Sequence, residues 1–102
     1  MQWDVHSPQK AKLVLRGSID ILSVGNIWQD IGTRQVAWLK NKTSSPQELI
    51  VDAKEINYLD GAGVAFLIDI KHQQDMHQGT LILEGLDPKY QALLNRFNPI
   101  DP

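Results

Sequence analysis

The stretch ELIVDAKEINYLDGAGVAFLIDIKH, residues 48–72, predicts a buried strand, a short connection and a long apolar helix. Residues 49–51 form a continuous β-favouring run, which is typical of a strand covered on both faces. We place this strand at Glu48–Asp52. The apolar residues from Val64 onward follow the three-four spacing of an amphipathic helix, which we place at Ala62–Gln78. A buried strand followed by such a helix indicates an α/β fold.

The junction between this strand and this helix is a candidate binding surface. Asp60 can cap the helix, because its carboxylate can accept the N–H groups that the first turn leaves unpaired. Gly61 and Gly63 carry no side-chain bulk, so another surface can approach the backbone closely. α/β folds place binding surfaces at such helix starts. We therefore predict a partner-binding surface formed by Asp60, Gly61, Ala62, Gly63, Val64 and Ala65.

Size and composition limit the classes of protein to which the chain can belong. Its 102 residues suit one domain with a modest core, and its net charge of −2 offers no basic face for nucleic acid. The absence of cysteine excludes disulfides, thiolate zinc sites and cysteine nucleophiles. We find no signal peptide and no apolar run near the roughly 18–20 residues of a membrane span. We expect a cytoplasmic domain over residues 1–98, and a tail or the start of a linker over 99–102.

The first half of the chain predicts a hairpin followed by a helix. Residues 3–6 and 11–17 read as two strands that form an antiparallel hairpin through residues 8–10, where Ser7-Pro8 favours a turn. The apolar stripe from Val24 to Leu39 predicts a helix with Ser23 as its N-cap.

Two glycines and two tryptophans in this first helix each allow two interpretations. Gly25 and Gly32 lie two turns apart, which favours close packing of the helix on the sheet over a smooth patch for a partner helix. Trp28 and Trp38 are interpreted as core residues, with one of them as an interface anchor in the alternative.

The last part of the chain predicts one more strand and one more helix. Thr80–Glu84 is an apolar strand that follows Gly79, a fitting residue for the end of the preceding helix. Asp87 and Pro88 open the last helix as its cap and first residue, and its apolar positions include Tyr90 and residues 93, 94 and 97. The predicted order is β-β-α-β-α-β-α, with right-handed crossovers between parallel strands.

Three segments of the chain resemble the STAS domain family, the fold of bacterial anti-sigma-factor antagonists. LVLRGSID at 13–20 is similar to the family's strand end before its first helix. LIVDAKEINYLDGAGVAFL at 49–67 resembles its second strand, connection and D-S/T-x-G helix start, and LILEGLDPKYQALLNRFN at 81–98 resembles its last strand and helix. The resemblance implies a STAS fold, with a mixed four-stranded sheet and about three helices mainly on one side.

The resemblance implies recognition of a protein partner rather than catalysis, with no cofactor. In the antagonists, a partner kinase phosphorylates a serine or threonine in the D-S/T-x-G turn. Here the turn is Asp60-Gly61-Ala62-Gly63, and neither Gly61 nor Ala62 carries a hydroxyl, so we expect no phosphorylation at the family position. An anti-sigma-factor antagonist-like signalling protein without this switch, bound to an anti-sigma kinase, is the alternative function.

The segment GLDPKYQALL, together with this turn, resembles a second branch of the family more closely. That branch comprises the STAS proteins and N-terminal STAS domains of Mla-type ABC lipid-transport systems. The resemblance implies a non-catalytic accessory domain that docks on the ATPase subunit or permease, at the cytoplasmic face of the inner membrane. The helix that starts at Asp60 would be the docking edge. Pro99 and Pro102 fit both an independent protein and the head of a longer permease.

Three alternative chemistries compete with the binding interpretation. Asp20, Asp52 and Asp60 follow strands and could hold a divalent cation, but capping and solvation explain them equally, so we predict no metal site. His72 and His77 are five residues apart, which does not place two ligands on one helical face. The glycine-bearing helix start leaves weak nucleotide binding open, although no Walker or dinucleotide motif is present.

Overall fold

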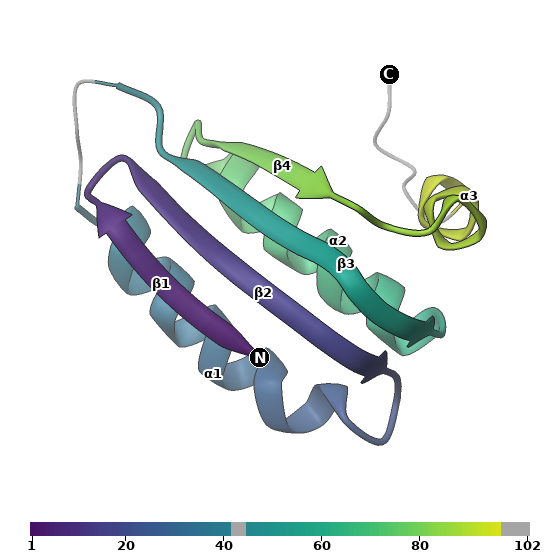
Figure 1. Cartoon of the computed structure of the whole chain (residues 1–102). Coiled ribbons are helices and arrows are strands. Elements are labelled where there is room, and N and C mark those ends of the chain that lie inside the picture. The colour runs from purple at the N-terminus through teal and green to yellow at the C-terminus, as the bar shows by residue number, and fades with distance from the viewer. Residues whose placement is uncertain (42–44, 97–102) are drawn as a thin grey trace.

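The computed structural model describes residues 1–41 and 45–96 (Figure 1). The elements, in chain order, are β1 (Gln2–Ser7), β2 (Lys10–Ile19), α1 (Val24–Leu39), β3 (Glu48–Leu59), α2 (Gly61–Met76), β4 (Thr80–Glu84) and α3 (Pro88–Arg96). The predicted order of strands and helices is confirmed. The predicted tail at 99–102 and the apolar position Phe97 lie outside the described residues.

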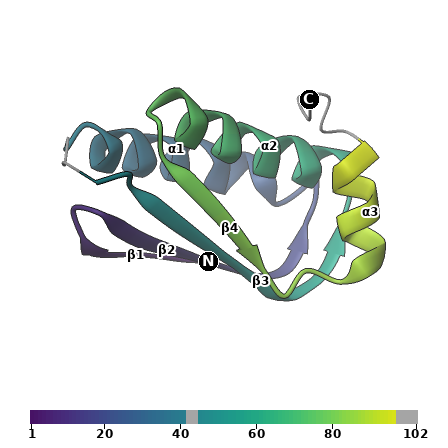
Figure 2. The ribbon, with the colours of Figure 1, turned by 90° about the horizontal axis from the view of Figure 1, so that it is seen from above.

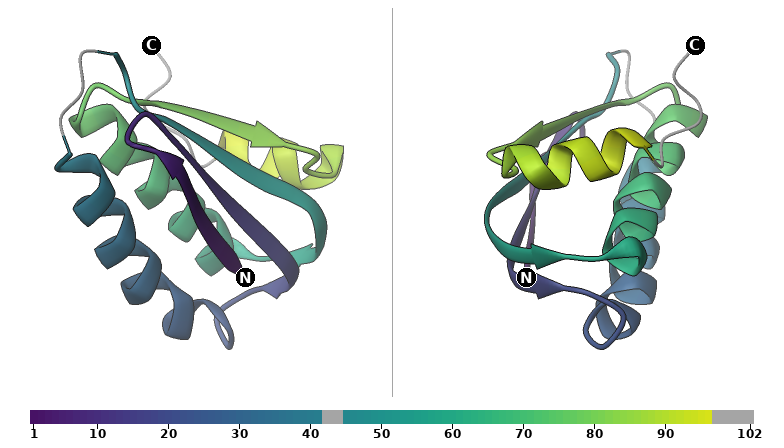
Figure 3. Two further views of the ribbon diagram at one scale, coloured as in Figure 1. Left: turned by 60° about the vertical axis from the view of Figure 1, so that its left-hand side comes forward. Right: turned by 90° about the vertical axis from the view of Figure 1, so that its right-hand side faces the viewer.

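The four strands form one mixed sheet in the order β1-β2-β3-β4. β1 pairs antiparallel with β2, whereas β2, β3 and β4 are mutually parallel. Because both crossovers return on the same side, α1 and α2 cover one face of the sheet and run side by side (Figure 2). Figure 3 shows α3 at an angle to the two long helices, beyond the end of β4, and it contacts α2. The Tyr90 hydroxyl of α3 donates a hydrogen bond to the Asn57 carbonyl of β3 at 3.2 Å.

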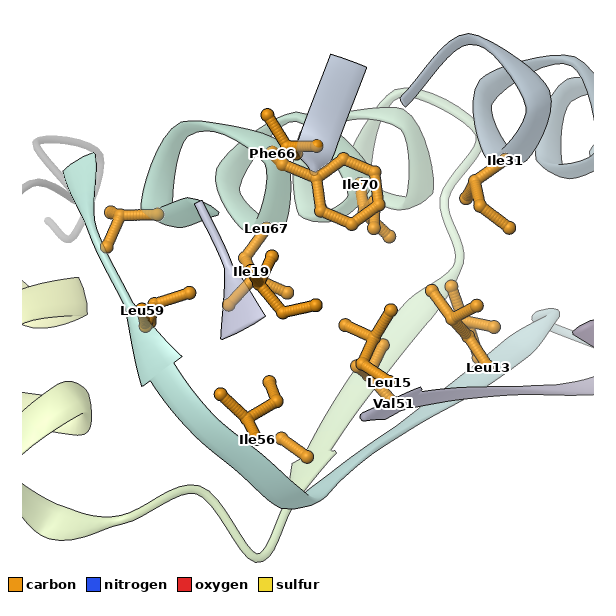
Figure 4. Packing of buried hydrophobic residues seen from close by; sticks show 14 of the residues in the cluster. Leu13, Leu15, Ile19, Ile31, Val51, Ile56, Leu59, Phe66, Leu67 and Ile70 are labelled. Atoms are coloured by element: carbon orange, nitrogen blue, oxygen red, sulfur yellow. The ribbon is translucent and has the colours of Figure 1, made fainter. Parts of the chain in front are cut away.

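The hydrophobic core fills the space between the sheet and the two long helices (Figure 4). Alternate residues of β2 and β3, among them Leu13 and Val51, point toward the helices and are fully buried. Phe66 of α2 is also fully buried and meets the Trp28 ring edge-to-face, with 5.7 Å between the ring centroids. This ring contact joins α2 to α1 above the sheet.

β3 is longer than the sequence indicates, because it runs to Leu59 instead of ending at Asp52. Beyond Asp52 it has lost β4 as a neighbour and pairs with β2 alone, through two register shifts. Residues 53–59 therefore form a strand with one unpaired edge. This part of the strand contains polar side chains, so it lacks the continuous apolar run that predicts a buried strand. Ile56 and Leu59 lie in the core, whereas the Tyr58 side chain is 48% exposed.

The N-terminus of α1 and the C-terminus of α2 differ from the predicted ends of these helices. Ser23 occupies the N-cap position of α1, but its side chain makes no capping hydrogen bond to the helix. After α2, the residue in the left-handed conformation is Gln78, at φ 57°, and not Gly79. The Gly79 N–H donates to the Gln74 carbonyl at 2.8 Å, as in a Schellman motif. Gly79 is needed because a Cβ there would lie 2.7 Å from the Gln47 carbonyl oxygen.

Gly25 and Gly32 do not pack on the sheet. A Cβ at either position would meet no heavy atom within 4 Å, so the preferred interpretation of these glycines as helix–sheet contacts is wrong. The apolar stripe of α1 already fills the sheet-facing side, with Val24, Ile31 and Leu39 buried. The glycines therefore lie away from the sheet, in accord with the alternative of a smooth patch on the outer face of the helix.

Candidate docking site

Asp60 joins the start of α2 to the loop between β2 and α1. Its Oδ1 accepts a hydrogen bond from the Gly63 N–H at 3.0 Å, so the predicted helix cap is confirmed. Its Oδ2 accepts a second hydrogen bond from the Ile21 N–H at 3.1 Å. The hydrogen bond from the Gly63 N–H, assisted by that from Ile21, holds the pKa of the Asp60 carboxyl below its usual range. The carboxylate form is therefore favoured by the folded structure.

This lowered pKa predicts a specific dependence of stability on pH. The contribution of Asp60 is fully present above the ordinary aspartate pKa of about 3.9 and is lost as the pH falls through the lower pKa of the folded state. We expect Asp60→Asn to melt below the wild-type protein at neutral pH, and the difference to shrink as the pH falls below the ordinary aspartate pKa. Thermal unfolding followed by circular dichroism measures this. Asp75→Asn removes an exposed carboxylate from the same helix and should retain the wild-type profile.

The six residues of the predicted binding surface divide between the surface and the core. Gly61 and Ala65 are exposed, and Asp60 and Ala62 are partly exposed. Gly63 and Val64 are buried, because helical spacing turns them toward the sheet. A Cβ at Gly63 would collide with the Ile19 carbonyl oxygen and the Leu59 side chain. The glycine at this position therefore lets α2 approach the sheet closely, and not a partner. A Cβ at Gly61 would meet nothing within 4 Å, which leaves the backbone there open to a partner.

A shallow groove of about 450 Å³ adjoins the exposed part of this surface. It lies between α1 and α2, and Asp69 forms part of its polar wall. A second hollow of about 730 Å³ continues along the two helices and shares Trp28 and Asp69 with the first. The first groove is lined by Trp28, Gly61, Val64, Ala65, Ile68, Asp69 and His72.

Trp28 lines the groove but was not among the six residues predicted to form the binding surface. Its ring rests on Phe66, and its Nε1 donates a hydrogen bond to Asp69 Oδ2 at 2.9 Å. Trp38 is buried, as predicted for a core residue, whereas Trp28 packs against the core but is only partly buried. The sequence carried no local signal for this placement, because the hydrogen-bond partner of the indole, Asp69, lies on another helix.

The three aspartates considered as metal ligands each have a structural partner. Asp20 Oδ1 accepts hydrogen bonds from the Leu22 and Ser23 N–H groups. The Lys54 ammonium lies 2.8 Å from Asp52 and lowers the pKa of that carboxyl. Within residues 1–41 and 45–96, no three His, Cys, Asp or Glu side chains are grouped so that they could hold a metal ion.

The helix start is also poorly suited to a nucleotide phosphate. The Gly63 N–H that an anion would use already binds the Asp60 carboxylate, and a phosphate beside it would meet like charge. The Asp69 carboxylate similarly binds the Trp28 indole, so the site offers apolar contact area rather than open charged ligands. No helix in the described part of the chain is long and apolar enough to cross a membrane.

A family model described as "Mlab, STAS domain" matches residues 4–98. The chain belongs to this STAS domain family. The anti-sigma factor antagonist SpoIIAA in its unphosphorylated form has the same fold, with a TM-score of 0.72 and 18% identity over 92% of this chain and 80% of that one. A crystal structure of Mglu matches with a TM-score of 0.63 and 10% identity, over 86% of this chain but 19% of Mglu. Of the curated proteins compared with the chain, none matches.

These comparisons confirm the predicted family and fold. The STAS domain has the predicted mixed four-stranded sheet and three helices, in the predicted order. SpoIIAA shares the fold alone at this level of identity, so its partners do not transfer to this STAS domain.

Proposed function

We propose that this STAS domain is a non-catalytic docking module of an Mla-type ABC phospholipid-transport system and binds its ATPase subunit through the start of α2. The observation that carries the proposal is the groove at Gly61 and Ala65, which is open, largely apolar and bordered by the exposed part of Trp28. The description of the matching family model supports the transport system. Binding to the ATPase would hold the domain at the cytoplasmic face of the inner membrane.

The chemistry of the helix start supports a contact that is not switched by phosphate. Gly61 and Ala62 offer no hydroxyl, so a kinase has no acceptor in the first turn of α2. The free space above Gly61 lets the backbone of a partner approach α2 closely. Trp28 adds a rigid aromatic surface of the kind enriched at binding hot spots.

A charge placed in this contact tests the proposal. We expect Ala65→Glu to weaken binding of the purified ATPase subunit at least about tenfold, because a carboxylate would enter an apolar contact that already holds Asp69. Isothermal titration calorimetry measures the affinity. Ala92→Glu introduces the same charge at an exposed position of α3, away from the groove, and should bind like the wild type. Equal affinity of both variants would remove the start of α2 from the interface.

The second candidate is a signalling protein similar to the anti-sigma-factor antagonists. The structural match to SpoIIAA favours it. The same titration with an anti-sigma kinase separates the two functions. Binding of the kinase, without binding of the ATPase subunit, would replace the transport proposal with the signalling one.

A further inference from the structure

The loop between β2 and α1 presents two neighbouring aliphatic side chains to solvent. Ile21 is 74% exposed and Leu22 is 87% exposed, which makes them the most exposed large hydrophobic residues in the described part of the chain. Scattered exposed aliphatics are ordinary, but two adjacent ones at the tip of a loop form a compact apolar projection. We refer to Ile21 and Leu22 as the apolar tip.

Hydrogen bonds at its base hold the apolar tip in one conformation. The Ile21 N–H donates to Asp60 Oδ2 at 3.1 Å, and the Leu22 N–H donates to Asp20 Oδ1 at 3.0 Å. The Ser23 hydroxyl donates to the Ser18 carbonyl at 2.8 Å. The side chains are therefore exposed by a well-bonded loop, and a partner would spend little ordering entropy to bind them.

The apolar tip lies at the same end of the molecule as the start of α2. Figure 1 shows the carboxyl ends of β2 and β3, and the loops that follow them, at the same end of the sheet. Asp60 is the direct link, because it accepts a hydrogen bond from Ile21 and is followed by Gly61, which lines the groove. A partner seated on Gly61 and Ala65 would therefore have the apolar tip within reach.

The charges around this end define the chemistry of the partner. Residues 17–33 and 55–70 contain no lysine or arginine. Four basic residues flank these segments, and each lies beside a carboxylate: Arg16 is 2.9 Å from Glu55, Arg34 is 3.0 Å from Asp30, and Lys54 and Lys71 are each 2.8 Å from Asp52 and Asp75, respectively. The surface beside the apolar tip keeps a net negative charge, which complements a basic surface and repels anionic lipid or a second copy of the chain. The carboxylates in the two segments are Asp20, Asp30, Glu55, Asp60 and Asp69.

We propose that Ile21 and Leu22 anchor the STAS domain in an apolar pocket with a basic rim on the ATPase subunit. This inference rests on the proposed function and adds a second contact, on a different element, to the one at the start of α2. It also explains why the loop keeps two aliphatic side chains in water. Because opposite charges on the two surfaces attract one another, the association should weaken as salt is added.

The experiment is a titration of the purified ATPase subunit with serine variants of the apolar tip. We expect Ile21→Ser and Leu22→Ser each to weaken binding about tenfold or more, and Leu22→Met to retain it. Met76→Ser alters another exposed apolar residue, 57% exposed at the far end of α2, and should bind like the wild type. Wild-type affinity should fall between about 0.1 M and about 1 M salt, where the Debye length shrinks from about 10 Å to about 3 Å.

The possible failures are distinguishable. Absence of wild-type binding to the ATPase subunit would overturn the proposed function and this inference together. Wild-type binding that both serine variants retain would overturn the inference alone. Sedimentation that shows a dimer lost in Leu22→Ser, or binding to phosphatidylglycerol vesicles lost in that variant, would assign the apolar tip to a second copy or to a membrane instead. Melting temperatures equal to the wild type, expected for such exposed positions, exclude misfolding as the cause.

Discussion

Replacement of Gly63 by alanine is expected to lower the free energy of unfolding by about 3 kcal/mol. For a domain of this size, that corresponds to a fall in melting temperature of roughly 10–20 °C. A Cβ at Gly63 would collide with the backbone carbonyl of Ile19, at the end of β2, and with the buried Leu59 side chain. The carbonyl belongs to the backbone of a sheet strand and cannot rotate away as a flexible side chain would. α2 would have to move off the sheet.

Gly61→Ala is a closely matched control for this prediction. It is the same substitution in the same turn of α2, but its Cβ meets nothing within 4 Å. Alanine favours a helix over glycine, so Gly61→Ala should melt at or slightly above the wild-type temperature. Thermal and urea unfolding of the two variants measure the difference. Equal stability of Gly63→Ala and Gly61→Ala would contradict the close contact between α2 and β2.

Replacement of Gln74 by leucine is expected to lower the free energy of unfolding by about 2–3 kcal/mol, although leucine is more apolar and similar in size. Gln74 is fully buried. Its Nε2 donates to the Thr80 carbonyl at 2.9 Å and the Gln47 carbonyl at 3.3 Å, and its Oε1 accepts from Gln35 Nε2 at 3.1 Å. Leucine would remove a donor from the Thr80 and Gln47 carbonyls and the acceptor from one N–H of the buried Gln35 amide. The Gln47 carbonyl would keep the Thr80 N–H, and the Gln35 amide would keep the Ile70 carbonyl.

A double-mutant cycle isolates the contact between the two buried amides. Urea unfolding of Gln35→Leu, Gln74→Leu and the double variant gives the three free energies. We expect the double variant to lose less stability than the sum of the single ones, because it removes both partners of the hydrogen bond together. If the losses in the free energy of unfolding of the two single variants simply add in the double variant, the hydrogen bond between Gln35 and Gln74 contributes no stability of its own. Gln29→Leu, on the exposed side of α1, should change the stability little.

The buried amides also show how the architecture is held together at the end opposite the docking site. Gln47 Nε2 donates to the carbonyls of Pro8 and Trp38, which ties the β1–β2 turn and the end of α1 to β3. Gln74 ties α2 and β4 to the same point. Among the described residues, no buried side-chain nitrogen or oxygen lacks a partner. These hydrogen bonds tie the β1–β2 turn and the turn between α2 and β4 to the start of β3.

The sequence by itself determined the order of elements, the family and the two best helix caps. These features depend on residues close together along the chain. Asp60 caps α2 through Gly63, and Asp87 accepts from the Lys89 N–H at 3.0 Å, both within one helical turn. The helical and strand periods of the apolar residues likewise need only local spacing. The β1–β2 hairpin was located for the same reason, and the start of α2 lies at Gly61, one residue before the predicted Ala62.

Only the tertiary structure decided which side of each element meets solvent and which segments meet one another. β3 extends to Leu59 because β2 lies beside it, and Gly63 must be glycine because the Ile19 carbonyl lies against it. Trp28 stays partly exposed, and its bond to Asp69 spans two helices. Such contacts join residues some forty positions apart. Their geometry is set by how the helices settle on the twisted sheet, which no local pattern records.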